Sequence, residues 1–310
     1  MMSRYPWLGA WVAAVAAFAL TLIGGQATSG SGLLGAALSF SALTVLAALG
    51  QMLVISAGPG NADLSIPSSI ALSSAVAMLV MDGQNSLIFP GLLAACLAGA
   101  AVGLANACLI HILRIPPIIA TLAASLIVMS CAISIGRGLK IKPPPLFAEM
   151  TTMRISGIPL LAILAVSVSI AVWFAVERTA YGRALCAIGQ NPRAAELAGI
   201  HVKRTHLLTY VLCAAMAGLT GALIAGFAGG NSLNQGEEYL MGTIAVVVIG
   251  GTSVIGGRPC VPGIWGAALF MFLVVAMLNA AGAGSGVRLV LTGLIIITVI
   301  ALSSTRPGDH

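Results

Sequence analysis

Charged residues are scarce in this sequence of 310 residues. Asp, Glu, Lys and Arg make up only 7% of the chain, whereas apolar residues make up 59%. A soluble domain carries roughly a quarter charged residues, because water has to solvate its surface. The composition therefore excludes a water-soluble globular protein and predicts a chain whose main solvent is the lipid bilayer.

Motifs for catalysis and nucleotide binding are also missing. The lysines are Lys140, Lys142 and Lys203, and none lies in the Gly-Lys-Ser/Thr context of a phosphate-binding loop. No His-Glu-x-x-His or Gly-x-Ser-x-Gly motif occurs, and no apolar stretch contains a pair of carboxylates. We therefore expect a chain that is not an enzyme and that binds no metal or other cofactor itself.

Uninterrupted apolar stretches divide the sequence into segments of membrane-spanning length. Nine windows lack Asp, Glu, Lys and Arg, and the first is long enough for two helices. A spanning helix needs about 20 mostly apolar residues. The sequence therefore predicts an all-α, polytopic bundle of about ten transmembrane helices that forms a single domain, residues 1–310. The predicted spans lie near residues 7–24, 38–57, 65–81, 88–112, 117–136, 158–176, 206–228, 240–256, 262–281 and 287–304.

The first predicted span has an alternative interpretation. Arg4, the apolar run after it and Gly25-Gln26-Ala27 are similar to a cleavable signal peptide. The apolar run is longer than the core of about 7–15 residues that such signals have. An uncleaved first span is therefore favoured.

The distribution of Lys and Arg predicts the orientation, because cytoplasmic loops are enriched in these residues. With the N-terminus inside, nine of them fall in the cytoplasm and five outside. The cytoplasmic set is Arg4, Arg114, Arg178, Arg183, Arg193, Lys203, Arg204, Arg258 and Arg306. Both termini are thus predicted to be cytoplasmic and residues 137–157 extracytoplasmic. The net charge of +6 then follows from topology and requires no nucleic-acid partner.

The positions of the ionisable residues also bear on the energy source. Carriers driven by protons or sodium usually keep ionisable residues inside the bundle. Here nearly every ionisable residue falls at the end of a predicted span. His111, His201 and His206 lie at such ends as well, and we expect surface histidines there and no metal ligands. This pattern favours a protein whose energy comes from another chain over an ion-driven carrier.

Residues 177–205 form the longest polar stretch that this topology places in the cytoplasm. Within it, Asn191 suits a helix N-cap, Pro192 the first helical position and Gly199 the residue past the end. The helix between them would have two turns, too few to be stable alone in water. It must therefore dock, either on its own bundle or in a groove of a separate ATPase, and the residues alone leave both alternatives open.

Residues 58–67 join the second and third predicted spans and contain two prolines and two glycines, which prevent a continuous helix. Asp63 in this segment would cost about 2.5–3.5 kcal/mol or more at the bilayer centre. Its carboxylate must therefore face water, a polar cavity or a helix N-terminus. Capping the next helix and lining a permeation path are both open.

The third predicted span carries a stripe of serines. At 100° per residue, Ser65, Ser68, Ser69 and Ser73 fall within an arc of roughly 140°, and Ser74 lies outside it. Such a stripe is predicted to face the bundle interior. It suits close helix packing or an uncharged, hydroxyl-lined path for a polyhydroxylated solute, and the two are compatible.

Three segments resemble the permeases of ribose-type ABC sugar importers. Residues 181–185 (YGRAL) and 189–200 (GQNPRAAELAGI) are similar to the cytoplasmic loop of that family. Residues 246–253 (VVVIGGTS) and 256–258 (GGR) resemble its Gly-Gly-Thr-Ser segment, and residues 115–122 (IPPIIATL) resemble the start of its fifth span. The likeness runs from about residue 41 to the C-terminus.

The resemblance implies a non-catalytic permease subunit of an importer in the bacterial inner membrane. Its implied partners are a second permease copy or a paralogue, a periplasmic sugar-binding protein and a cytoplasmic ATPase that binds ATP and Mg. The implied ATPase-coupling residues are Asn191, Pro192, Arg193, Ala194, Ala195, Glu196 and Gly199. Ala194, Ala195 and Ala198 would form a small docking face. The candidate substrate pathway comprises Asp63, Ser65, Ser69, Thr252 and Ser253.

The segment after the second predicted span departs from the family pattern. The family typically has Gly-Gly-Ile-Asp-Leu-Ser-Val-Gly-Ser there, whereas residues 58–68 of this chain are GPGNADLSIPS. Asp63, Leu64 and Ser65 match the family pattern. The residues before them differ from it, and Pro67 falls in the region where the family has valine and glycine. The departure suits a substrate other than ribose, or pairing with a different permease.

Two other functions compete with a sugar permease. Branched-chain amino-acid permeases have a similar cytoplasmic loop but generally lack the Asp-Leu-Ser element and the Thr-Ser after Gly-Gly. Asp63-Leu64-Ser65 and Thr252-Ser253 therefore favour sugar. The second alternative is an autonomous secondary carrier or channel, which would transport without any ATPase.

Overall fold

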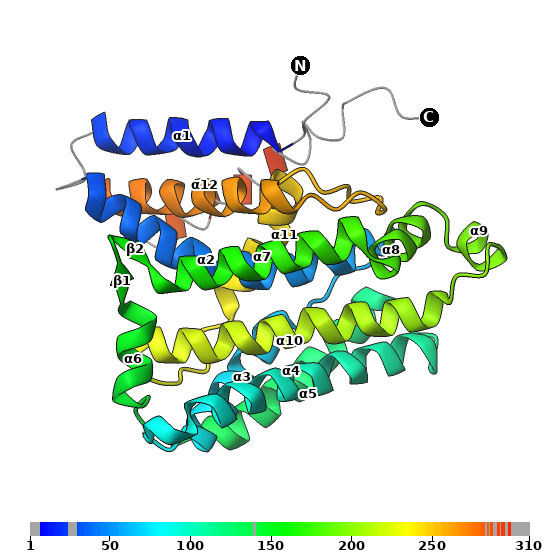
Figure 1. The fold of residues 1–310 in the computed structure, drawn as a ribbon, viewed down its shortest axis with the longest axis horizontal. Helices are drawn as coiled ribbons and strands as arrows, with labels where there is room; N and C mark the ends of the chain where they lie inside the picture. Colours follow the sequence, from blue (N-terminus) through cyan, green and yellow to red (C-terminus); the bar gives the residue numbers. More distant parts are fainter. Residues whose placement is uncertain are drawn as a thin grey trace.

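The structure is a computed structural model that describes residues 7–23, 30–138 and 141–282, together with isolated positions between 284 and 298. Most of its helices lie side by side as a bundle (Figure 1). The helices are α1 (Leu8–Ile23), α2 (Gly30–Ser56), α3 (Ile66–Met81), α4 (Ile88–His111), α5 (Pro117–Gly136), α6 (Pro145–Thr152), α7 (Leu160–Arg178), α8 (Ala180–Gln190), α9 (Pro192–Leu197), α10 (Val202–Ala228), α11 (Glu237–Ile249) and α12 (Val261–Ala280), with a 3₁₀ turn at Asn85–Leu87.

The helical, membrane-spanning character of the bundle is confirmed, but the count of about ten spans is not. Six of the described helices are long and apolar enough to cross a membrane: α2, α4, α5, α7, α10 and α12. Helices α1 and α3 have 16 residues each, and α11 has 13. The tenth predicted span, 287–304, lies mostly outside the described residues.

The two ends of the bundle carry different structures (Figure 1). At one end lie α6 and a small hairpin, in which β1 (Arg154–Ile155) pairs antiparallel with β2 (Ile158–Pro159). Ser156 and Gly157 form its turn, with positive φ angles of 51° and 85°, as two-residue hairpin turns require. The all-α prediction missed this hairpin. At the opposite end, α8 and α9 project from the bundle.

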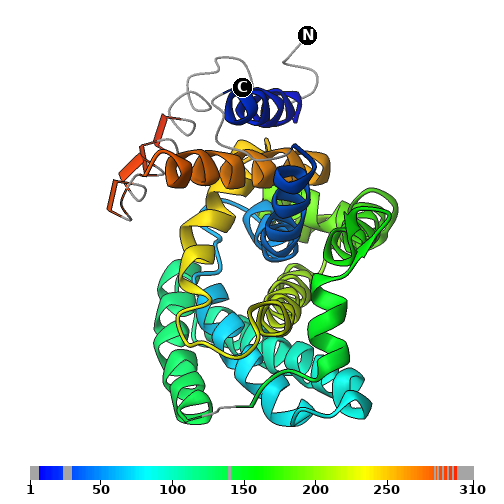
Figure 2. The same cartoon turned by 90° about the vertical axis from the view of Figure 1, so that its left-hand side faces the viewer.

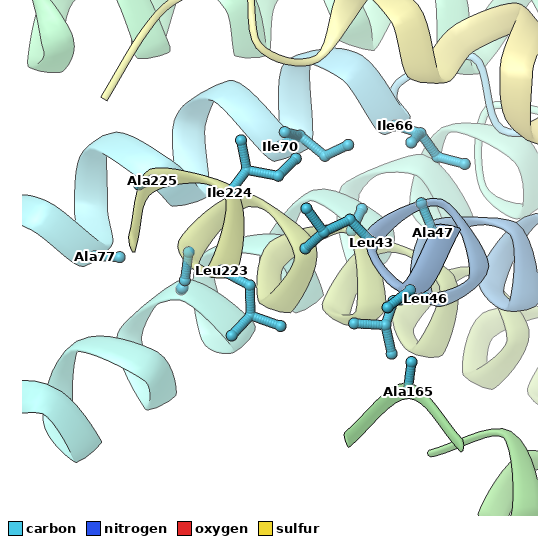
Figure 3. Packing of buried hydrophobic residues seen from close by; sticks show 14 of the residues in the cluster. Leu43, Leu46, Ala47, Ile66, Ile70, Ala77, Ala165, Leu223, Ile224 and Ala225 are labelled. Carbon is cyan, nitrogen blue, oxygen red and sulfur yellow. The ribbon is translucent and has the colours of Figure 1, made fainter. Parts of the chain in front are cut away.

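Helix α10 lies at the centre of the bundle, where it packs against α4, α3 and α2. Figure 3 shows this core, in which α2, α3 and α10 all contribute aliphatic side chains. Leu46, Ile70 and Ala225 in this cluster have no exposed surface. The core therefore joins segments that are far apart in the sequence.

Helices α4 and α10 approach each other closely at Gly99 and Gly103. A Cβ atom on Gly99 would lie 2.1 Å from the Ala214 carbonyl oxygen, and one on Gly103 would lie 2.3 Å from that of Tyr210. Contacts this short are impossible for real side chains, so the backbones can meet only because both residues are glycine. Small residues commonly allow such approaches between membrane helices.

We predict that Gly103→Ala lowers the thermal unfolding midpoint of the purified protein, because α4 and α10 would have to separate. Overpacking of this kind costs about 1–3 kcal/mol. Gly242→Ala is the control, since a Cβ atom there meets nothing within 4 Å and alanine favours helix. Equal midpoints for the two variants in a tryptophan-fluorescence melt would contradict the close-packing argument.

Candidate functional site

The connection between α2 and α3 contains Asp63, whose side chain is only 1% exposed. Asp63 Oδ1 accepts hydrogen bonds from the Ser65 backbone N–H at 2.9 Å and from the Ser65 hydroxyl at 2.6 Å. The Asp63 backbone N–H donates to Gln51 Oε1 at 3.2 Å. Asp63 thus fixes the backbone that leads into the first turn of α3.

Three further helices hold the same connection through polar side chains. Asn106 of α4 donates to the Ser65 hydroxyl at 2.8 Å, and Thr121 of α5 accepts from the Leu64 N–H at 3.2 Å. The Tyr210 hydroxyl of α10 donates to Asn61 Oδ1 at 3.2 Å. The sequence pattern alone did not identify these three partners. It could have done so, since each is a polar side chain inside a predicted apolar span.

Several polar atoms of this buried cluster lack a hydrogen-bond partner among the described residues: Gln51 Nε2, Asp63 Oδ2, Asn106 Oδ1, Ser69 Oγ and Ser73 Oγ. They are carboxylate, amide and hydroxyl groups, which can form hydrogen bonds with sugar hydroxyls. The cluster is closed to solvent in this conformation. Ser74, outside the predicted arc, is as buried as Ser69, so burial does not separate the two sides of α3.

The connection between α2 and α3, residues 57–65, is the first irregular segment of the backbone, and residues 250–260, which follow α11, are the second. Helix α11 runs across the direction of its neighbours (Figures 1 and 2). The helix ends at Ile249 because Gly250 and Gly251 follow, and Gly251 has a φ of 87°. The predicted span 240–256 is therefore wrong in its second half. Thr252, 4% exposed, accepts a hydrogen bond from the Cys260 N–H at 3.2 Å, which closes the loop before α12.

The two irregular segments meet each other and α8 at a junction of glycines. The Gly257 N–H donates to the Ser56 carbonyl at the end of α2, at 2.9 Å. A Cβ atom on Gly189 of α8 would lie 2.1 Å from that carbonyl oxygen and 2.2 Å from the Gly257 nitrogen. A Cβ atom on Gly256 would meet Gly58 at 2.7 Å. The end of α8 therefore touches both irregular segments directly.

The predicted short helix is confirmed as α9, and its ends are formed as expected. Asn191 Oδ1 accepts from the Ala194 N–H at 3.0 Å, Pro192 is the first helical residue, and Gly199 has a φ of 84°. In α8 next to it, burial and the nearby Glu177 raise the pKa of the Cys186 thiol, which keeps this thiol in its unreactive protonated form.

Most of α9 is exposed, and Leu197 has 86% of its surface accessible. Arg193, Ala194, Glu196 and Ala198 are exposed as well. Ala195 is only 4% exposed, because it faces its own chain. The expectation that Ala195 belongs to a small outward docking face is therefore wrong.

The candidate residues thus fall into three places. Asp63, Ser65 and Ser69 lie together at the start of α3, whereas Thr252 and Ser253 belong to the loop after α11. The residues proposed for coupling lie on α9 and its caps. In the described part of the chain, no three His, Cys, Asp or Glu side chains group as metal ligands would.

Comparison with known proteins gives a consistent result. The ribose import permease protein of Bacillus subtilis is 32% identical over 269 residues, which cover 86% of this chain and 82% of that protein. The galactose/methyl galactoside import permease protein of Escherichia coli K12 is 29% identical over 293 residues, 87% of this chain and 85% of that protein. The D-allose transport system permease protein of Escherichia coli K12 is 27% identical, over 84% and 80%.

No solved structure matches the chain. The family model described as branched-chain amino acid transport system / permease component matches residues 33–300, which is well over half of the sequence. Together with the apolar helices, this match shows a multi-pass membrane protein. The chain belongs to this family of transport-system permease components.

Proposed function

We propose that the chain is the permease subunit of an ABC importer in the bacterial inner membrane, and that it forms the path for a sugar. The observation that carries the proposal is the arrangement of α8 and α9. A capped, exposed helix of six residues stands at one end of the bundle, and α8 joins it to both irregular segments through the glycine junction. A periplasmic binding protein delivers the sugar, and a separate ATPase binds ATP and Mg.

Docking of the ATPase on α9 explains why so short a helix is exposed. Two turns of helix are unstable alone, and Ala195 is its one buried residue. The exposed Leu197, Ala194 and Ala198 offer apolar contacts to a groove, while Arg193 and Glu196 can form ion pairs at the rim. Such exposed pairs contribute only about 0–1 kcal/mol each, so the apolar contacts dominate.

Movement of α9 would reach the irregular segments because the packing between them is rigid. Gly189 touches the end of α2 and Gly257 with no space for a methyl group. A displacement of α8 must therefore displace the segments around Asp63 and Thr252. We propose that this route opens the closed polar cluster and exposes Asp63, Ser65, Ser69, Thr252 and Ser253 to the substrate.

Sugar is favoured over branched-chain amino acids as the substrate. The three relatives described above are named for ribose, galactose/methyl galactoside and D-allose, although the family description names amino acids. The buried cluster has hydroxyl and amide groups and the Asp63 carboxylate. Among the described residues it has no cationic side chain that could pair with an amino-acid carboxylate. A second permease copy or a paralogue completes the path.

We propose that both termini and α9 are cytoplasmic. Lys142 is exposed and lies shortly before α6, which stands at the end of the bundle opposite α9 (Figure 1). In intact spheroplasts, an impermeant maleimide is expected to label a cysteine at Lys142 and to label one at Arg193 only after lysis. The reverse pattern would invert the topology.

Leu197→Glu is expected to lower ATPase co-purification and ATP-driven uptake at least tenfold, because it places a charge in the apolar docking contact. The fold should remain intact, since Leu197 is 86% exposed. Leu146→Glu at the opposite end, 46% exposed, is the matched control. Uptake by Leu197→Glu equal to the control, or uptake by proteoliposomes that contain no ATPase, would exclude the proposed function.

Ser69→Ala tests the pathway separately from the packing. The Ser69 hydroxyl is buried without a partner among the described residues, so its loss removes no internal hydrogen bond and should not lower the unfolding midpoint. We expect sugar uptake to fall severalfold. Ser39→Ala is the control, because the Ser39 hydroxyl donates to the Gly35 carbonyl within its own helix. Unchanged uptake in Ser69→Ala would remove this residue from the pathway.

A further inference from the structure

A groove lies between the end of α4 and the start of α10. It has a volume of about 150 Å³ and is lined by Ala107, Cys108, His111, Ile112, Lys203, Arg204 and Leu207. Sites for whole small-molecule ligands usually have about 300–1,000 Å³. The groove therefore fits part of a larger molecule, and it is distinct from the polar cluster and from α9.

The floor of the groove is apolar and continues into an exposed apolar surface. Ile112 is 72% exposed and Leu207 is 40% exposed. Leu113, which follows Ile112, is 63% exposed. In a membrane protein, exposed aliphatic side chains of this kind face lipid chains, so the floor suits hydrocarbon.

The rim of the groove is cationic. Lys203 and Arg204 are consecutive, exposed residues at the start of α10. Neither side chain forms an ion pair or hydrogen bond with the described residues. Both charges meet the apolar floor at one end of two spanning helices, and this combination is typical of the boundary between hydrocarbon and headgroups.

His111 lines the same wall of the groove. Its ring packs against His206 with 5.3 Å between the ring centroids. The Nε2 atoms of both histidines are buried without a partner in the described part of the chain. Both side chains are half-buried, so the expectation of surface histidines holds only in part for these two.

Arg114 supplies a third charge close to the end of α4. Its φ of 56° is left-handed, and the Ile115 N–H donates back to the Leu109 carbonyl at 3.3 Å. Glycine is the residue that adopts such a left-handed conformation most readily. An arginine there keeps a positive charge beside the groove at a cost in backbone energy.

We propose that this groove binds an anionic phospholipid. One acyl chain lies on the floor formed by Cys108, Ile112 and Leu207, and the phosphate is held by Lys203 and Arg204. The complementary charges and the membrane-boundary position identify the lipid, because a soluble anion would leave the apolar floor uncovered. The site holds the ends of α4 and α10 together, next to the point where α9 enters α10.

The test measures lipid binding to the purified full-length protein by native mass spectrometry. Phosphatidylglycerol is expected to bind and to raise the unfolding midpoint, whereas phosphatidylcholine and inorganic phosphate are not. The double variant Lys203→Gln, Arg204→Gln should bind phosphatidylglycerol roughly 30-fold more weakly, since each basic residue contributes about five- to sixfold. Arg178→Gln, Arg183→Gln is the matched control, with the same loss of charge at the same end.

Cys108 provides a second measurement on the unmodified protein. It lines the groove, so bound phosphatidylglycerol should slow its alkylation by a membrane-permeant maleimide. Cys131, exposed on α5, is the internal control and should react at the same rate with either lipid. Equal binding of the two lipids, equal affinity in the two double variants, or protection of Cys108 by inorganic phosphate would each overturn the proposal. Loss of a second copy from the Lys203→Gln, Arg204→Gln variant without loss of lipid would assign the groove to a protein interface instead.

Discussion

Backbone N–H and C=O groups inside a bilayer must find their partners in the protein, because the hydrocarbon offers none. This constraint dominates the structure wherever a helix is too short to cross. Helix α3, with 16 residues, is about 24 Å long, and α11, with 13 residues, is about 20 Å long. Both fall short of a hydrocarbon core of about 30 Å. Irregular backbone next to them must therefore be held by neighbouring helices.

The two irregular segments meet this constraint in different ways. Around Asp63, polar side chains of α2, α4, α5 and α10 provide the hydrogen bonds. After α11, the backbone bonds largely to itself, and glycines allow it to fold tightly against Ser56 and Gly189. A polar cluster and a glycine junction thus arise from the same requirement. The candidate pathway and the candidate coupling route both lie at these two irregular segments.

Much of the helical arrangement could be predicted from where charges are missing. Helix α5 (Pro117–Gly136) begins and ends as predicted, and α4 and α10 are close to their predicted ranges. A charge-free window sets the maximum length of a helix but does not show where glycines end it, so the span 240–256 was overestimated. The hairpin at Arg154–Pro159 was missed because polar connections carry no apolar period. The burial of Ala195 and the contact between His111 and His206 depend on tertiary packing, which a linear pattern does not contain.

The need to bond the backbone inside the protein also explains where the sequence resembles the permease family. Apolar residues on a lipid-facing helix surface can replace one another freely, since any of them suits hydrocarbon. A break in a helix requires particular residues, such as Asp63 to bind the Ser65 N–H or Gly189 to admit the Ser56 carbonyl. The three resembling segments, around Thr121, Gly189 and Thr252, and the matching Asp63-Leu64-Ser65 element lie at such breaks or contact them. The resemblance to the permease family therefore falls at the positions where this structure allows the least choice of residue.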